Sequence, residues 1–333
     1  MNDNACYSRL PAHAAVDRAA ALSDEVLRSQ LRNEHPLIVD TDCLMYTPMI
    51  QQIYDICASA IANRTGSFVF AGRKRVGKTR AMRLVFRELE KAFPEVLFLR
   101  VIATGRYDSK ERGFYETLYA TFDEEADPRD RAEVRRQTIK KAWISAARAR
   151  RANCIVLRID EIQDWGPQEM TWLKAIGNQL EEYYRLALLA IAAGSEEVAQ
   201  RKRALGSQTR GDLIGRFMAT ILPVHGFRSA EELEAYLVGF DDAEKYCYPP
   251  GTGISYTEFF VPAAYLGGFR LATQAPALWR VLCEFADREH EFGMQRVSST
   301  VKTFFNLLAH DQQCASEKVI EHWRTAVQAA PNV

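Results

Sequence analysis

Residues 67–79 read SFVFAGRKRVGKT, an apolar run followed by a glycine-rich loop. The loop, Gly72 to Thr79, fits the pattern G-x-x-x-x-G-K-[ST], which predicts a phosphate cradle where a strand precedes it and a helix follows. Its glycines let the main chain wrap closely around a phosphate, so that N–H groups point inward. The start of the following helix adds a favourable dipole for an anion. The stretch therefore predicts an α/β fold built around a nucleotide-binding loop.

The side chains of this loop have expected roles with ATP and Mg²⁺, the two cofactors that we predict. Lys78 is expected to reach the β- and γ-phosphates and to act in catalysis, and Thr79 to offer its hydroxyl to Mg²⁺. The predicted nucleotide contacts of this segment are those of Gly72, Arg73, Lys74, Arg75, Val76, Gly77, Lys78, Thr79 and Arg80.

A second apolar run, residues 155–161 (IVLRIDE), ends in two acids. Asp160 is expected to hold Mg²⁺ through water, and Glu161 to polarise the attacking water as a general base. Such a run is weak evidence alone, but its place on a later strand after the phosphate loop strengthens it. Arg158 stands inside the run, where a buried charge is costly unless it is paired. The sequence gives no account of that arginine.

Strands and helices alternate around these two motifs. The expected strands are 67–71, 96–103, 154–159, 186–192 and 217–222, with helices expected at 18–32, 49–63, 79–93, 114–122, 131–151 and 169–184. This alternation predicts a doubly wound parallel five-stranded sheet with right-handed crossovers. Beyond it only helices are expected, at 229–240, 256–266, 274–290 and 298–309. The predicted domains are an N-terminal extension (1–45), an α/β nucleotide-binding domain (46–225) and a helical lid with a C-terminal tail (226–333).

Three residues outside the loop are further candidates for phosphate contact. Ser195 ends the fourth strand, where it is expected either to contact the γ-phosphate or the attacking water, or to cap the next helix. Arg216 precedes the fifth strand and is expected to act in catalysis on the γ-phosphate of a neighbouring subunit, with Arg210 as the second choice. A solvated arginine is the alternative for this position. Arg270, in the sequence GGFR, is expected to return to the phosphates from the lid.

Two basic segments are candidates for binding the phosphates of duplex DNA, although the 43 basic and 43 acidic residues of the chain balance. The first follows the second strand, and the second is the helix at 131–151. The basic residues of that helix spread around its circumference at 100° per residue, so a solvated or subunit-contacting helix stays open. No helix-turn-helix or zinc-finger pattern indicates base readout. The predicted DNA contacts are Arg106, Lys110, Arg112, Lys140 and Lys141.

Composition sets limits on the class of protein. The 333 residues suit two domains, and 47% are hydrophobic. The seven cysteines are scattered, which predicts reduced thiols and no disulfide framework. No apolar run approaches the ~20 residues that span a bilayer, so no membrane partner is expected. We expect a cytoplasmic protein.

In their order along the chain, the GRKRVGKT loop, the IVLRIDE strand, the AAGS strand end, the GRF triplet and the GGFR segment resemble an AAA+ ATPase. The sequence IDEIQDW (159–165) and the compact lid look like the TnsC/TniB regulators of DNA transposition, including members from CRISPR-associated transposons. This resemblance implies a homo-oligomeric ring or filament that forms on double-stranded DNA with ATP. It also implies a bridge between a TniQ-type target selector and the transposase, with hydrolysis driving disassembly. The basic loop positions and Arg158 depart from the family pattern and suggest slow hydrolysis.

Three other functions stay open. The chain is alternatively an ATP-bound DNA scaffold with little turnover. A second alternative is an initiator or loader ATPase of the Orc/DnaA type, a class that usually appends a winged-helix or helix-turn-helix domain after the lid. A small-molecule kinase is the third, and it would have no need of Arg216.

Overall fold

The computed structural model describes residues 16–39, 45–104, 110–122, 125–286, 291–310 and 316–330. The chain forms two compact units. The unit that we call the α/β unit holds Ile50–Lys74 and Ala81–Val224. The other, the helical unit, holds Met1–Met49, Arg75–Arg80 and His225–Val333. The first and last helices of the chain thus share one unit, whereas the predicted division into three parts stays a prediction.

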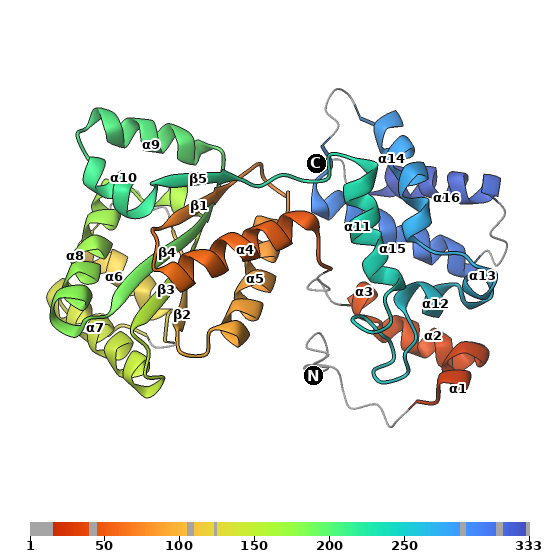
Figure 1. Cartoon of the computed structure of the whole chain (residues 1–333), viewed down its shortest axis with the longest axis horizontal. Coiled ribbons are helices and arrows are strands. Elements are labelled where there is room, and N and C mark those ends of the chain that lie inside the picture. The colour runs from red at the N-terminus through yellow and green to blue at the C-terminus, as the bar shows by residue number, and fades with distance from the viewer. Residues whose placement is uncertain are drawn as a thin grey trace. The chain divides into compact units, whose positions relative to one another are not determined.

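A five-stranded sheet with the order β2-β3-β4-β1-β5 forms the centre of the α/β unit (Figure 1). All four neighbouring pairs of strands are parallel, which confirms the predicted fold class. The strands are β1 (Phe68–Ala71), β2 (Leu97–Ile102), β3 (Cys154–Asp160), β4 (Ala187–Gly194) and β5 (Thr220–Pro223). The fifth strand begins later than expected, because the residues just before it form a short helix.

Helices cover both faces of this sheet (Figure 1). The helices of the unit are α4 (Pro48–Asn63), α5 (Lys78–Ala92), α6 (Glu111–Tyr119), α7 (Ala132–Ala149), α8 (Pro167–Tyr184), α9 (Glu197–Ser207) and α10 (Gly211–Phe217), with the short 3₁₀ helix η1 (Ile162–Asp164). Every residue of β3 is buried, as expected for a strand with both faces covered, so its sequence is almost continuously apolar.

The two faces of β3 have different partners. Ile155, Leu157 and Ile159 belong to a core cluster that includes residues of α6, α7 and α8. Successive side chains of a strand point to opposite faces, so Arg158 and Asp160 lie on the other face. There Phe86 of α5 packs edge-on against a phenylalanine of β2, with ring centroids 5.9 Å apart.

The strand register places three strand ends at one edge of the sheet. Ile159 of β3 is paired with Ala192 of β4, and Ala71 of β1 with Gly194 of β4. The carboxyl ends of β1, β3 and β4 therefore meet, and this edge is where open α/β sheets bind their ligands.

The helical unit contains helices from both ends of the chain. They are α1 (Arg18–Ser23), α2 (Glu25–Glu34), α3 (Pro36–Val39), α11 (Ala230–Asp241), α12 (Tyr256–Phe260), α13 (Pro262–Leu266), α14 (Ala275–Glu284), α15 (Met294–His310) and α16 (Ser316–Ala329), with a 3₁₀ helix η2 (Ala272–Gln274). Across the described residues, no helix is long and apolar enough to cross a bilayer.

Two helices that we expected to be continuous are broken. The expected helix at 18–32 divides at Asp24, whose carboxylate accepts the N–H groups of Val26 and Leu27 and so starts a new helix. The expected helix at 256–266 divides before Pro262, which has no N–H to continue the hydrogen-bond ladder and instead begins α13.

His35 fastens the N-terminal helices into this unit. Its ring is fully buried, with the rings of Tyr248, Tyr256, Phe259 and Phe260 at centroid distances of 4.4–5.0 Å. Nδ1 accepts the N–H of residue 37 at 3.0 Å, so Nε2 carries the proton of the neutral ring. Nε2 has no hydrogen-bond partner among the described residues and points among aromatic faces. Burial lowers the pKa of His35 well below its ordinary value.

Candidate functional site

The phosphate loop runs from the end of β1 to the start of α5, as the sequence predicts. A Cβ added to Gly72 would lie 2.1 Å from the carbonyl oxygen of Val224, so only glycine fits there. Gly77 has φ +99°, which favours glycine for a second reason. Arg75 also has a positive φ, of 67°, a strained conformation of the kind that gathers at binding loops.

The cradle fits phosphate groups. Lys78 is the first residue of α5 and is only 8% exposed, and a buried ammonium group needs anionic company. Its neighbours Arg73, Lys74 and Arg75 are exposed, and Arg73 Nε lies 3.6 Å from a carboxylate oxygen of Glu196. The main-chain turn, the helix start and the lysine supply the donors that an anion requires at such a site. Thr79 is exposed and Arg80 half-buried.

Beyond β3, the chain turns sharply at Glu161, whose φ and ψ of 59° and 44° are left-handed. The side-chain amide of Gln163 donates to Glu161 Oε2 at 2.6 Å. The oxygen of the same amide accepts the main-chain N–H of Ser195, at the end of β4, at 2.9 Å. Gln163 therefore holds the candidate general base and joins two strand ends. Gln163 lies within the IDEIQDW stretch, but the sequence alone assigns it no role, because an amide two residues after the acids has no expected part in the phosphate or metal chemistry of the two motifs.

Ser195 lies where we expected, but it does not cap α9. The N-cap residue of that helix is Glu196, and Ser195 Oγ is buried without a hydrogen-bond partner in the described structure. The N-cap interpretation is thus wrong. A buried, unpaired hydroxyl beside the Glu161–Gln163 turn is available to a ligand group, which leaves the phosphate or water contact as a prediction.

Asp160 is held by two arginines. Arg158 Nη2 lies 3.0 Å from Oδ2 of Asp160, and Arg158 Nε lies 3.2 Å from Oδ1. Arg100 of β2 donates from Nε to Oδ2 at 3.2 Å, and its Nη2 also lies 3.2 Å from Oδ2. This contact explains the charge inside the apolar run, since Arg158 is paired where it is buried. Burial lowers the pKa of Arg158, and the Asp160 carboxylate opposes that shift.

This arrangement does not fit a metal ion at Asp160, because guanidinium groups already use both carboxylate oxygens. Within the described residues, no group of three or more histidine, cysteine, aspartate or glutamate side chains offers another metal site. The phosphate cradle fits its ligand, whereas the predicted Mg²⁺ ligand Asp160 is occupied by cations of the chain itself.

The two arginines before β5 contact α8 of the same chain. Arg216 Nη2 lies 2.6 Å from Glu181 Oε1. Arg210 donates from Nη2 to Thr171 Oγ1 at 2.6 Å, and its Nε lies 3.3 Å from an oxygen of Asp212. Their action on a neighbouring subunit stays a prediction.

Arg270 is anchored inside the helical unit. Its Nη1 donates to the carbonyl oxygens of Tyr265 and Phe269 at 2.9 and 2.7 Å. The guanidinium carbon lies 3.7 Å from the centre of the Tyr265 ring, which is a cation–π contact. A phosphate contact by Arg270 stays a prediction.

The candidate DNA contacts that the structure describes are exposed or half-buried. Arg112 donates to the carbonyl oxygen of Pro128, and Lys140 donates to Gln179 Oε1 at 3.1 Å. Lys110 and Lys141 are exposed, and Arg106 lies outside the described residues. In the basic helix α7, Arg135 is only 2% exposed and donates to the carbonyl oxygens of residues 112 and 127. Arg135 therefore links α7 to the segments around residues 112 and 127, so this helix is not uniformly solvated.

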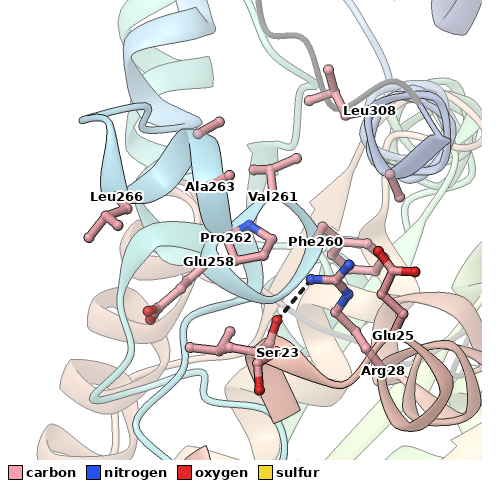
Figure 2. Close-up of a pocket in the computed structure, with 13 residues that line it drawn as sticks. Ser23, Glu25, Arg28, Glu258, Phe260, Val261, Pro262, Ala263, Leu266 and Leu308 are labelled. Atoms are coloured by element: carbon pink, nitrogen blue, oxygen red, sulfur yellow. Dashed lines mark hydrogen bonds between the residues drawn. The ribbon is translucent and has the colours of Figure 1, made fainter. Parts of the chain in front are cut away.

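A pocket of about 450 Å³ lies in the helical unit between the N-terminal helices and α12, α13 and α15 (Figure 2). Apolar side chains such as Phe260, Val261 and Leu308 line it, and Arg28 and Glu258 add charge. Arg28 Nη1 donates to the carbonyl oxygen of residue 22 at 3.0 Å. No sequence motif predicts this pocket, because the residues that line it come from segments far apart in the sequence.

Comparison with known proteins agrees with this geometry. Residues 62–201 match a family described as an AAA domain. No curated protein matches the chain. A structure of Drosophila ORC bound to DNA is similar, with a TM-score of 0.51 and 15% identity over 96% of this chain and 68% of that chain. The Aeropyrum pernix ORC2 protein in ADPNP–ADP complexes is also similar, with a TM-score of 0.54 and 11% identity over 88% of this chain and 70% of that chain.

At these identities the two structures show the fold alone. The matched segment begins just before β1, contains the phosphate loop and the IVLRIDE strand, and ends in α9. Residues 62–201 thus resemble an AAA domain, the fold around them is a parallel five-stranded α/β fold, and the protein is an ATPase by enzyme class.

Proposed function

We propose that this protein is an AAA+ ATPase that binds ATP at the phosphate loop and assembles on double-stranded DNA. The observation that carries the proposal is the sequence of β1, cradle and α5, with buried Lys78 at the start of the helix. The acidic turn after β3 lies at the same edge of the sheet. In this proposal Lys78 binds the phosphates, and Glu161, held by Gln163, is the general base.

A neighbouring subunit completes the site in this proposal. Arg216 of the neighbour stabilises negative charge on the γ-phosphate, so that ATP bound between subunits favours the assembled state. The Glu181 contact of Arg216 lies at a partly exposed position, which an approaching subunit can reach. Among the predicted DNA contacts, Lys110 and Lys141 are exposed, and in this proposal they meet DNA phosphates.

The biological role in this proposal is the regulation of DNA transposition. It rests on the resemblance of the IDEIQDW stretch and the compact lid to TnsC/TniB regulators. A TniQ-type target selector and a transposase are then the expected partners. Only this sequence resemblance supports a role in transposition, and the two similar structures neither add to that support nor oppose it.

An initiator-type ATPase is the second candidate, favoured by a specific observation. Both similar structures are ORC proteins, and one of them was solved bound to DNA. The two candidates share ATP and DNA and differ in their protein partners. A pull-down experiment separates the two candidates. A transposition regulator should bind a purified TniQ-type protein and transposase, whereas an initiator should bind an origin-recognition partner.

The core proposal is tested by ATP hydrolysis and assembly. We expect duplex DNA to stimulate hydrolysis, and DNA with a non-hydrolysable ATP analogue to produce rings or filaments in electron micrographs. Glu161→Gln should keep assembly and lose turnover, while Lys78→Ala should lose both. A protein that stays monomeric with DNA and the analogue, or whose turnover responds only to a metabolite, would overturn the proposal.

A further inference from the structure

The Asp160 carboxylate is saturated by the chain itself. An ionised carboxylate offers about four lone-pair sites on its two oxygens. Arg158 donates to both oxygens, and Arg100 donates from Nε to Oδ2 with its Nη2 also beside that oxygen, all at 3.0–3.2 Å. Magnesium needs these same lone pairs, whether it binds a carboxylate directly or through one of its water ligands, so it competes with the guanidinium groups.

The sheet itself builds this arrangement. Arg100 and Arg158 are direct register partners on the parallel strands β2 and β3. Asp160 follows two residues after Arg158, so all three side chains stand on one face of the sheet. The Arg158 guanidinium also lies over the Phe86 ring of α5, with its carbon 5.6 Å from the ring centre. Strand pairing and helix packing therefore fix the two arginines at the carboxylate.

The two arginines differ in their freedom to leave. The Arg158 side chain is 4% exposed, and withdrawing it would leave a buried carboxylate short of a partner. The Arg100 side chain is 48% exposed on the edge strand, so water can receive it. A divalent cation approaching Asp160 also meets two like charges at that carboxylate.

We infer that Arg100 and Arg158 occupy the place of the divalent cation at Asp160, so that this chain binds nucleotide almost independently of Mg²⁺. Arg100 is the side chain that controls whether a divalent cation can reach the Asp160 carboxylate. This inference rests on the proposed binding of ATP at the phosphate loop. It also explains why an arginine stands within an otherwise apolar strand, since Arg158 supplies positive charge at Asp160.

The test is the affinity for a fluorescent, non-hydrolysable ATP analogue, measured by titration in excess Mg²⁺ and again in excess EDTA. The ratio of the two affinities measures the coupling of nucleotide to metal and needs no turnover. For the wild type we expect a ratio close to one. Arg100→Ala should raise the ratio about tenfold by freeing lone pairs on Oδ2, a change equal to ~1.4 kcal/mol of binding free energy.

Two further variants make the result specific. Arg100→Ala combined with Asp160→Asn should return the ratio to the wild-type value, because the gain needs the carboxylate. Arg64→Ala is the matched control, since Arg64 pairs with Asn153 at the opposite end of β3 and should leave the ratio unchanged. Thermal melts by circular dichroism verify that each variant is folded.

The possible failures are distinguishable. A wild type whose affinity already rises strongly with Mg²⁺, and does so equally in Arg100→Ala, overturns the metal-replacement inference and leaves ATP binding intact. Absence of nucleotide binding in the wild type under both conditions overturns the proposed function and this inference with it.

Discussion

Arg158 and Asp160 stand two residues apart on β3, with Nη2 and Oδ2 3.0 Å apart and each side chain 4% exposed. A buried ion pair adds little net stability over a well-packed apolar pair. The loss of one partner is nevertheless costly, because it leaves the other charge buried and less well paired. Arg158→Met leaves Asp160 with Arg100 as its remaining partner, so we expect the free energy of unfolding to fall by about 3 kcal/mol, the low end of the range for a broken buried pair. Urea denaturation measures the loss.

The double variant Arg158→Met with Asp160→Leu should recover most of that loss, because no buried unpaired charge is left and Arg100, whose side chain is 48% exposed, can turn to water. The Asp160→Leu single variant is needed to complete the cycle. If the two single losses simply add in the double variant, the two side chains are not coupled as the contact indicates.

The Gln163 amide yields a second prediction, one that concerns turnover. Gln163→Leu removes the hydrogen bonds to Glu161 and to the N–H of Ser195 while it keeps a side chain of similar size. A general base typically contributes 10²–10⁴-fold, so we expect its misplacement to lower kcat by about tenfold or more. Nucleotide affinity should stay within about twofold, since Gln163 belongs to the acidic turn and not to the cradle.

The matched control is Gln208→Leu, at an exposed position after α9. It should leave both kcat and affinity unchanged. An equal loss of affinity and kcat in Gln163→Leu, or a reduced thermal stability that accounts for the lost turnover, would assign Gln163 a structural role only.

Much of the α/β unit could be predicted from local pattern. The cradle between β1 and α5 has a motif whose chemistry dictates residue types, and short apolar runs alternating with helices imply parallel strands. Strand ends shifted by one to three residues, as Phe68–Ala71 and Thr220–Pro223 show. These shifts arise because the ladder of hydrogen bonds, and not hydropathy, sets where a strand begins.

Contacts between distant segments could not be predicted. The pairing of Arg100 with Asp160 depends on the register of β2 against β3, and nothing local to either residue specifies that register. The Gln163–Ser195 hydrogen bond depends in the same way on two strand ends meeting. Arg158 was at least visible as an anomaly, because a charge in an apolar run demands a partner.

The N-terminal helices show the same limit. His35 and its aromatic partners, Tyr248 and Tyr256 among them, are separated by most of the chain. The proline that follows His35 indicates a helix boundary, but it does not predict that aromatic rings surround the histidine. Ala21, Leu31, Leu37 and Met45 belong to the core cluster of the helical unit, and no local pattern reveals those contacts.

Acidification should destabilise the helical unit through His35. Its pKa is depressed in the folded state, so the unfolded chain binds the proton more readily. The stabilisation by neutral His35 is complete above the ordinary histidine pKa of about 6.5 and is lost as the pH falls below it, by at most ~1.4 kcal/mol per pH unit. Urea melts at several pH values measure the slope. His35→Phe should flatten this part of the profile, whatever its own stability, and an unchanged slope would contradict the assignment.

A mixing experiment tests whether Arg216 acts across subunits. The Arg216–Glu181 contact is intrachain, at 25% and 40% exposure, so such a pair holds the arginine by only about 0–1 kcal/mol. Arginines that act in this way contribute about 10³–10⁵-fold to phosphoryl transfer, so Arg216→Ala and Glu161→Gln should each be inactive alone. Mixed oligomers regain turnover if Arg216 acts in trans, because a Glu161→Gln subunit, which keeps assembly, supplies the arginine to the intact general base of an Arg216→Ala subunit. A mixture that stays inactive although it co-assembles would place Arg216 in a purely intrachain role. Arg210→Ala, mixed in the same way, is the control for the second arginine, which donates to Thr171 of its own chain.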